Sequence, residues 1–333
     1  MEPELSETRQ PLRAGVIGVG SLGQHHARVY TQLPGVRLAG VVDADPARAR
    51  EIAKKHRCPA FQDPAQLLGQ VDLVSIVVPT ALHFGVARLF LEAGVHCLLE
   101  KPMTTDLDEA DRLLALAKET RALLQVGHIE RFNPAILAIR KFKSPPLFIE
   151  AHRLGPYSPR NTDIGVVLEL MIHDLDIVLD MVGGEVASVE ALGVPVLSRT
   201  EDIANVRLRF RGGCVANLTA SRVTTEKQRK IRLFTRESYL SVDYLKKEVK
   251  VYRLKEGADP SQAGSLLGLS KMIAMETLPI RDEEQLKLEL GSFADCVREG
   301  SRPLVSGEQG RQALALGLEI ERQIREAVKA RLG

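Results

Sequence analysis

Three glycines near the start of the chain have the spacing of a phosphate-binding loop. Gly18, Gly20 and Gly23 form the pattern GxGxxG, which starts at the end of an apolar run at 13–19 and opens a helix-like stretch at 21–33. Glycines at these positions permit a tight turn, close approach of a pyrophosphate and close packing of the helix on the strand. Free N–H groups and the dipole at the helix N-terminus then favour the negative charge of the phosphates. The pattern therefore predicts a dinucleotide site.

An acidic residue at the end of the second apolar run narrows the choice of dinucleotide. Asp43 follows the run at 36–42 and lies twenty residues after the last of the three glycines. A carboxylate there would accept hydrogen bonds from the adenosine ribose and repel a 2′-phosphate, so we expect NAD rather than NADP. Arg48 lies close by in the sequence and could still accommodate a 2′-phosphate. Ser21 and Leu22 of the loop complete this part of the predicted cofactor site.

The next two apolar runs also end in residues suited to a ligand crevice. The third run is followed by Pro79, Thr80 and, on the next helix, His83, and the fourth run is followed by Glu100. Because the carboxyl ends of the strands in an open α/β sheet line the ligand crevice, these four residues are candidate neighbours of the cofactor. His83 could equally be a capping or packing histidine.

Lys101 is the candidate for chemistry at the end of the fourth run. A lysine there could donate to a substrate hydroxyl and stabilise a developing alkoxide. The alternative is a solvated lysine that ends a strand, and only the surroundings of a site separate the two interpretations. Pro102, which follows it, permits a cis peptide bond.

The elements that must position these residues alternate regularly over the first 127 residues. Runs of β-branched and aliphatic residues suit strands buried on both faces, and their alternation with helix-like stretches predicts a parallel sheet with right-handed crossovers. We expect helix starts at Asp45, Asp63 and Asp106. The helices are expected at 21–33, 46–56, 81–93 and 106–120.

After residue 127 the pattern changes from alternation to a series of strands. A helix-like segment at 134–142, a strand at 147–153 and an apolar helix at 167–182 precede strand-like segments from 186 to 253. Several of these segments alternate apolar and polar residues, which predicts an antiparallel sheet with helices on one face and, potentially, a second subunit on the other. The remaining expectations are irregular structure at 256–281 and helices at 283–298 and 307–330.

Composition excludes several classes of partner. The chain has 333 residues with 45 Lys and Arg against 43 Asp and Glu, too balanced for binding to nucleic acid or a membrane surface. It shows neither an 18-residue apolar run nor a signal-peptide pattern, and its four cysteines lack metal-ligand spacing. We therefore expect a cytoplasmic protein without disulfides or a metal. Trp is absent and aromatics are 4%, so polar side chains must supply most of any sugar specificity.

Taken together, the motifs carry a family resemblance that covers nearly the whole chain. GVGSLGQHH, VVDADP, VVPTALHFGVA, GVHCLLEKPMTTDLDEA, HDLDIVLDMVGG and the closing GSFADCVREGSRPLVSGEQGRQAL resemble the glucose–fructose oxidoreductase/inositol dehydrogenase/rhizopine catabolism (Gfo/Idh/MocA) family. The resemblance implies an NAD-binding Rossmann domain at 1–127. It also implies an α/β domain at 128–333 with an open, mostly antiparallel sheet for substrate binding and for homodimers or homotetramers. The implied reaction is hydride transfer between nicotinamide and a sugar or cyclitol carbon.

The resemblance also implies a catalytic histidine. The family has the pattern DxxxH, and the corresponding stretch here is ELMIH, in which His173 matches and Glu169 replaces the aspartate. Positions i and i+4 share a helix face, so the Glu169 carboxylate could lie beside the imidazole, although its extra methylene leaves its role open. His173 would remove the hydroxyl proton while Lys101 holds that oxygen and the hydride passes to the nicotinamide. Without the resemblance, a lone histidine on an apolar helix is ordinarily a core residue.

The resemblance also implies a class of substrate. VGHIERFNPAI and LGPYSPRNTDIGVVLELMIHDLD resemble the branch that oxidises C3 of UDP-N-acetylhexosamines for the amino sugars of lipid A or polysaccharides. A dehydrogenase of a free sugar or inositol and a non-catalytic dinucleotide-binding regulator remain alternatives, the latter disfavoured because it needs neither Lys101 nor His173. Any single arginine could also be an ordinary solvated side chain. The candidate donors to a nucleotide sugar are Arg131, Asn133, Arg153, Tyr157, Arg160 and Asn161.

Overall fold

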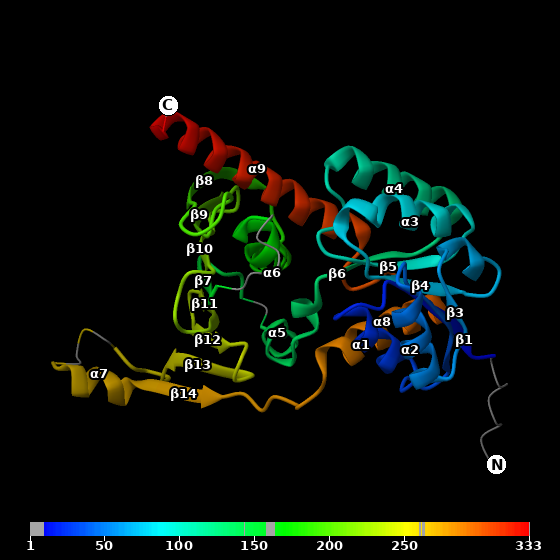
Figure 1. Ribbon diagram of the computed structural model, residues 1–333. Coiled ribbons are helices and arrows are strands. Elements are labelled where there is room, and N and C mark those ends of the chain that lie inside the picture. The colour runs from blue at the N-terminus through cyan, green and yellow to red at the C-terminus, as the bar shows by residue number, and fades with distance from the viewer. Residues whose placement is uncertain (1–9, 143, 158–163, 260, 262–263, 333) are drawn as a thin grey trace, which may run out of the picture. The chain divides into compact units, whose positions relative to one another are not determined.

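The computed structural model describes residues 10–142, 144–157, 164–259, 261 and 264–332 (Figure 1). They form two compact units, of which the first comprises Met1–Gly127 with Leu286–Arg311 and the second comprises His128–Gln285 with Gln312–Gly333. The sequence predicts one boundary after residue 127, whereas the chain returns to the first unit over Leu286–Arg311. A helical pattern indicates that one face is buried but not which element buries it.

The sheet of the first unit is parallel throughout, in the order β3-β2-β1-β4-β5-β6. The order reverses between β1 and β4, which is the switch point where doubly wound sheets bind ligands. This confirms the predicted Rossmann fold. No sequence pattern indicates β3, since two residues carry no periodicity. The strands are β1 (Leu12–Ile17), β2 (Val36–Val42), β3 (Ala60–Phe61), β4 (Leu73–Ile76), β5 (His96–Glu100) and β6 (Leu124–Gly127).

Three helices of the first unit begin at an aspartate, as the sequence predicts. The side chain of Asp45 accepts from Ala47 N and Arg48 N, and that of Asp106 accepts from Glu109 N, which satisfies N–H groups that have no partner within the helix. Asp63 caps a short 3-10 helix, η1 (Pro64–Leu67), in the same way. The helices are α1 (Gly23–Tyr30), α2 (Pro46–His56), α3 (His83–Glu92), α4 (Leu107–Thr120) and α8 (Gln285–Glu299).

The segment that returns to the first unit packs against the end of its sheet. A Cβ at Gly310 would lie 2.3 Å from a Val126 methyl, and one at Gly307 would lie 2.7 Å from Leu114, so both glycines permit close contact. In α8, Leu290 and Phe293 are fully buried. The last helix, α9 (Gly307–Leu332), begins in this unit and continues in the second.

The second unit is built on an eight-stranded sheet in the order β14-β13-β12-β11-β7-β10-β9-β8. Every neighbouring pair is antiparallel except β7 and β10, which confirms the predicted mostly antiparallel sheet. The strands are β7 (Phe148–Leu154), β8 (Val186–Val194), β9 (Ile203–Phe210), β10 (Val215–Ser221), β11 (Gln228–Phe234), β12 (Tyr239–Asp243), β13 (Glu248–Leu254) and β14 (Ile273–Thr277).

The prediction of irregular structure at 256–281 is wrong. This region contains α7 (Leu266–Met272) and β14, which extends the sheet by pairing with β13. Every residue of β14 is exposed, so no alternation of apolar and polar residues marks it as a strand.

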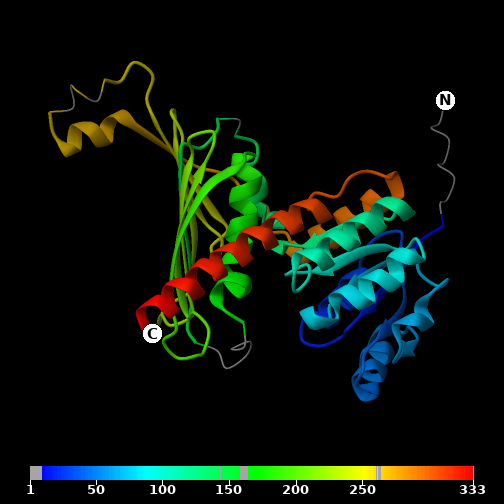
Figure 2. The same cartoon turned by 90° about the horizontal axis from the view of Figure 1, so that it is seen from above.

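Helices cover one face of this sheet, which Figure 2 shows with α6 (Ile172–Val182) and the C-terminal part of α9 on the same side. Leu175, Val178, Leu316 and Ile320 from these helices share one core with the inward-facing strand residues. The smaller helical pieces of this unit are η3 (Ile129–Phe132), α5 (Pro134–Ile139) and the π-helix η4 (Val167–Met171). Within the described ranges, none of the chain's helices has both the length and the apolar character needed to cross a bilayer.

Aromatic side chains form a row on the opposite face of the sheet. The ring centroids of Phe148 and Phe234 are 5.6 Å apart, those of Phe234 and Tyr239 are 4.8 Å apart, and those of Tyr239 and Tyr252 are 5.1 Å apart. These residues alternate along their strands with core residues such as Ile149 and therefore point away from the helices.

Candidate active site

Two glycines of the loop after β1 are required by the protein's own packing. Gly18 has φ +83°, and a Cβ there would lie 2.5 Å from the Val77 carbonyl oxygen. A Cβ at Gly23 would lie 1.8 Å from the carbonyl oxygen of Gly18. A side chain at either position would therefore displace the backbone of the turn or lift α1 from it.

Gly20 differs, because little of the protein fills the space beside it. A Cβ at Gly20 would meet only the end of the Arg48 side chain, at 3.5 Å. Packing therefore leaves room for a side chain, and the room is what a pyrophosphate needs to approach the backbone at the start of α1. The loop thus fits a dinucleotide. Ser21 and Leu22, the other predicted loop residues, are exposed next to it.

Asp43 is tied to the glycine loop by its own carboxylate. Its Oδ2 accepts the N–H of Val19 at 2.9 Å, and its Oδ1 accepts the N–H of Asp45 at 2.9 Å. Each carboxylate oxygen can accept a further hydrogen bond, so the side chain can still receive the hydroxyls of a ribose. Its fixed charge at the end of β2 fits NAD better than NADP.

His83 connects two segments at the carboxyl ends of β4 and β5. The ring is buried, with Nε2 2.9 Å from the Val78 carbonyl oxygen and Nδ1 3.0 Å from the Pro102 carbonyl oxygen. Burial lowers the pKa of His83 even though these carbonyls favour its charged form. The geometry favours the packing role that the sequence left open. Pro79 and Thr80 lie just before it, and Thr80 begins the short helix η2 (Thr80–Leu82).

The Glu100 carboxylate contacts the backbone of Lys101, the predicted catalytic lysine. It is 9% exposed, and its carboxylate lies 3.4 Å from Nε2 of His26 and accepts the N–H of Lys101 at 3.2 Å. Burial favours the neutral acid, but His26 and Lys101 outweigh it and hold the pKa of Glu100 below its usual range. Lys101 is half-buried, and its peptide bond to Pro102 is cis. The Glu100 carboxylate therefore holds the backbone of Lys101 at the end of β5.

In the second unit, two of the predicted substrate donors have structural partners instead. Arg131 is 1% exposed, with its guanidinium 3.2 Å from Asp176 and 2.6 Å from Asp180. Burial raises the pKa of Asp176 to about 7 in spite of this arginine. Asn133 caps α5 through Ala135 N. The sequence could not show the pairing of Arg131, because its acidic partners lie more than forty residues away along the chain.

Arg153 is also buried, but it borders a cavity. Its Nε and Nη2 bind both oxygens of Asp174 at 2.8 and 2.9 Å, and its Nη1 donates to Glu130 at 2.9 Å. Tyr157, a few residues beyond β7, is 41% exposed. Arg160 and Asn161 lie outside the described residues.

The predicted base, His173, follows a π-helical turn. It lies in the first turn of α6, directly after η4, and such π-helical turns occur frequently at functional sites. Its ring is half-buried and lies edge-on to that of His128, with centroids 6.4 Å apart. Glu169, four residues earlier, lies in η4 with its carboxylate 3.1 Å from Nη1 of Arg222.

Arg222 lies in this region and was not predicted from the sequence. It follows β10, is 4% exposed, and donates to Asp202 at 2.7 Å and to the Ile164 carbonyl oxygen at 2.7 Å. Its other donors reach the hydroxyls of Ser198 and Thr200. A single arginine after a strand carries no motif, so no pattern identifies it. Among the residues that the structure describes, no three His, Cys, Asp or Glu side chains are grouped as metal ligands.

Comparisons with known proteins agree with this geometry. Residues 12–128 match the oxidoreductase family with an NAD-binding Rossmann fold, and residues 138–241 match the Gfo/Idh/MocA C-terminal domain. The UDP-N-acetylglucosamine 3-dehydrogenase of Acidithiobacillus ferrooxidans is 40% identical over 96% of this chain and 98% of its own length. The scyllo-inositol 2-dehydrogenase (NAD(+)) of Bacillus subtilis is 27% identical over 96% of each chain.

A solved structure of the Acidithiobacillus ferrooxidans enzyme has a TM-score of 0.86 and 38% identity, covering 94% of this chain and 98% of that one. The chain therefore belongs to the Gfo/Idh/MocA family of oxidoreductases, as an NAD-dependent dehydrogenase that acts on a CH–OH group.

Proposed function

We propose that this dehydrogenase oxidises the C3 hydroxyl of a UDP-N-acetylhexosamine, with UDP-N-acetylglucosamine as the first choice. The observation that carries the proposal is the 40% identity to a UDP-N-acetylglucosamine 3-dehydrogenase, which extends over both units. The inositol dehydrogenases that match a similar share of the chain are 26–27% identical. Retention of Lys101 and His173 further supports an active enzyme.

In this proposal His173 and Lys101 have different roles in the oxidation of the C3 hydroxyl. His173 accepts the hydroxyl proton as general base. Lys101 donates to the hydroxyl oxygen and stabilises the negative charge that develops on it. NAD, when bound, supplies the acceptor for the hydride that leaves the carbinol carbon. Asp43 and the glycine loop hold the cofactor and contribute nothing to the proton transfer.

A substrate panel tests this proposal directly. The purified protein is incubated with NAD and, in separate reactions, with UDP-N-acetylglucosamine, UDP-N-acetylgalactosamine, UDP-glucose, free N-acetylglucosamine and myo-inositol. Each reaction contains a carbonyl trap, and NADH formation is followed by absorbance. We expect turnover with a UDP-N-acetylhexosamine and a trapped product whose NMR spectrum shows the C=N carbon of the carbonyl derivative at C3. Turnover of only inositol or the free sugar would instead identify a dehydrogenase of a free sugar or inositol. No turnover with any substrate would favour a non-catalytic dinucleotide-binding regulator.

We further propose that the aromatic face of the large sheet joins subunits into a dimer or tetramer. Phe234, Tyr239 and Tyr252 form a continuous apolar row there, and such rows on a soluble protein are typical of subunit contacts. Tyr252→Arg should lower the mass measured by light scattering to that of a smaller species. An unchanged mass would exclude this face as the interface.

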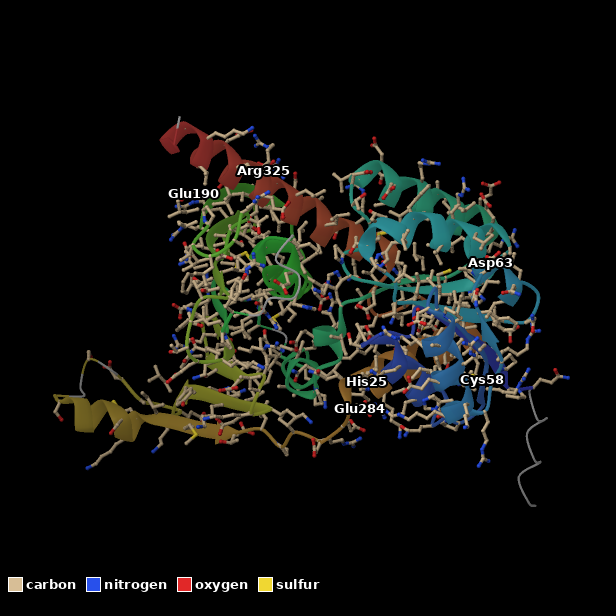
Figure 3. All side chains as sticks on the ribbon, viewed as in Figure 1. His25, Cys58, Asp63, Glu190, Glu284 and Arg325 are labelled. Atoms are coloured by element: carbon tan, nitrogen blue, oxygen red, sulfur yellow. The ribbon has the colours of Figure 1, made fainter. Side chains whose placement is uncertain are left out.

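We also propose that the enzyme is located in the cytoplasm. The four cysteines are free thiols, which suits the reducing cytoplasm. Figure 3 labels one of them, Cys58, which follows the C-terminal end of α2. The 3-keto nucleotide sugar would be a substrate for an aminotransferase, and we propose that its product serves the amino sugars of lipid A or a polysaccharide.

A further inference from the structure

A small pocket in the second unit is unusually rich in cations. It has a volume of about 140 Å³ and lies between the end of β7, the π-helix η4 and the connection from β10 to β11. Four basic residues and one acidic residue border it. These are Arg153, Arg222, Lys227, Arg229 and Glu169.

Two of the cations already form ion pairs with carboxylates of the same unit. Arg153 binds Asp174 through two nitrogens, and Arg222 binds Asp202 at 2.7 Å and Glu169 at 3.1 Å. Both arginine side chains are no more than 5% exposed. Because these carboxylates hold both guanidinium groups in place, Arg153 and Arg222 form the wall of the pocket. We do not expect them to donate to a ligand.

The other two cations are left for a ligand. Lys227 is exposed just before β11, and no carboxylate among the described residues lies within ion-pairing distance of it. Arg229 is 39% exposed, and its nearest carboxylate, Glu130 at 3.5 Å, already accepts from Arg153 and Asn133. Partial burial and the nearby Arg153 charge lower the pKa of Arg229. An anion in the pocket would relieve that repulsion.

We propose that this pocket binds the phosphate groups of the nucleotide sugar, with Lys227 and Arg229 as the donors. The inference rests on the proposed function and deepens it. The cavity is smaller than the several hundred Å³ that a whole ligand of this size needs, so it serves as a subsite. Guanidinium and ammonium groups are the side chains best suited to phosphate oxygens. Glu169 borders the pocket from η4, and the same helical stretch carries His173 four residues later.

The subsite separates this enzyme from its relatives that use uncharged substrates. A free sugar or inositol has no anionic group to place between Lys227 and Arg229. The two residues therefore act on substrate affinity and not on the hydride or proton transfer. In kinetic terms, their loss should raise KM for a UDP-sugar and change kcat much less.

Direct binding of UDP tests the proposal without relying on turnover. The protein is first saturated with NAD, so that the glycine loop of the first unit is occupied, and UDP is then titrated by calorimetry. Lys227→Ala and Arg229→Ala should each raise the Kd of UDP about tenfold, and the double variant should raise it further. Lys227→Arg should restore most of the affinity. Lys246→Ala is the matched control, because it removes an exposed lysine of the same unit from the turn between β12 and β13.

The outcomes separate the subsite from the substrate assignment. If the variants bind UDP as tightly as the wild type, the subsite proposal is wrong, even where UDP-N-acetylglucosamine is turned over. Failure of the wild type to bind UDP would overturn it as well. If UDP binding depends on Lys227 and Arg229 but no UDP-N-acetylhexosamine is oxidised, the subsite stands and the proposed function fails. Titration of N-acetylglucosamine 1-phosphate in a parallel arm shows whether one phosphate suffices or the nucleotide diphosphate is required.

Discussion

The carboxylate of Glu169 in η4 lies 3.1 Å from Nη1 of Arg222, which directly follows β10. The extra methylene that distinguishes Glu169 from the family's aspartate thus lets the carboxylate contact the wall of the cationic pocket. Arg222 in turn binds the loop at 198–202 and the Ile164 carbonyl oxygen, three residues before η4. We infer that Glu169 positions the helix that carries His173 and shapes the neighbouring pocket.

Removal of either proposed catalytic group should slow turnover. His173→Ala is expected to reduce kcat by about 10²- to 10⁴-fold, the usual contribution of a general base. Its Kd for NAD should stay unchanged, because the proposed cofactor residues belong to the other unit. Lys101→Met should reduce kcat by about 10²- to 10³-fold by removing the donor to the oxyanion. A fully active His173→Ala protein would disprove the assignment.

Gly20 and Gly23 should respond differently to the same substitution. Gly23→Ala places a methyl group 1.8 Å from the Gly18 carbonyl oxygen and should lower Tm strongly. Gly20→Ala meets only the flexible end of Arg48 at 3.5 Å, so Tm should hardly change. Its Kd for NAD should nevertheless rise at least about tenfold, because the methyl group occupies space that the pyrophosphate needs. Thermal unfolding with and without NAD measures both effects, and unaltered NAD affinity in Gly20→Ala would contradict the site.

Replacing Asp43 should weaken the preference for NAD. Asp43→Asn keeps an acceptor for Val19 N but removes the charge that repels a 2′-phosphate. We expect the ratio of NADPH to NADH dissociation constants to fall by about tenfold or more, equivalent to at least ~1.4 kcal/mol. Asp63→Asn, the same change at a helix cap of this unit (Figure 3), is the control that should leave both constants unaltered. Fluorescence titration of the two reduced cofactors gives the ratio.

Loss of Arg222 should destabilise the second unit. Arg222→Met leaves the fully buried Asp202 without its charged partner and should reduce the free energy of unfolding by about 3 kcal/mol. The control is Arg211→Met, because Arg211 and Glu185 also form a 2.7 Å pair but both are 69% exposed, and exposed pairs contribute little. Urea denaturation compares the two variants. Equal effects would mean that Arg222 has no structural role beyond that of a surface charge.

The stability of the protein should carry a pH dependence from Glu321 of α9. Burial and the nearby Glu201 carboxylate raise the pKa of Glu321 to about 7 from 4.5. Arg325, one turn later on the same helix (Figure 3), lies 3.8 Å away and only partly opposes this. The folded state therefore binds more protons than the unfolded state between these pH values, so stability should fall as pH rises from 4.5 to 7.

Glu321→Gln should remove that part of the pH dependence. At pH 8 the variant should be more stable than the wild type by about 1–3 kcal/mol, and the difference should disappear near pH 4. The free energy of unfolding in urea, measured from pH 4 to pH 8 for both proteins, provides the comparison. A slope that persists unchanged in the variant would assign the titration to another group, with Glu201 in the same cavity as the next candidate.

The sequence alone determined the features that are local in the chain. Glycine spacing, helix caps at Asp45 and Asp106, and strand periodicity depend on residues within a few positions of one another, and each is found where it was predicted. The cofactor and the family follow from the same local motifs. The position of β14 and the return of 286–311 to the first unit did not, because neither leaves a local pattern.

Only the tertiary structure decided which charged residues form ion pairs within the protein and which border a pocket where a ligand could bind. Arg131 and Arg153 look like ordinary donors in the sequence, yet each is held by buried carboxylates far away along the chain. Lys227 and Arg229 carry no motif, yet the fold places both beside a cationic pocket, where Lys227 forms no ion pair within the described part of the chain. The physical reason is that the ion pairing of a buried charge is set by residues distant in sequence, whereas a backbone turn or cap is set by its neighbours.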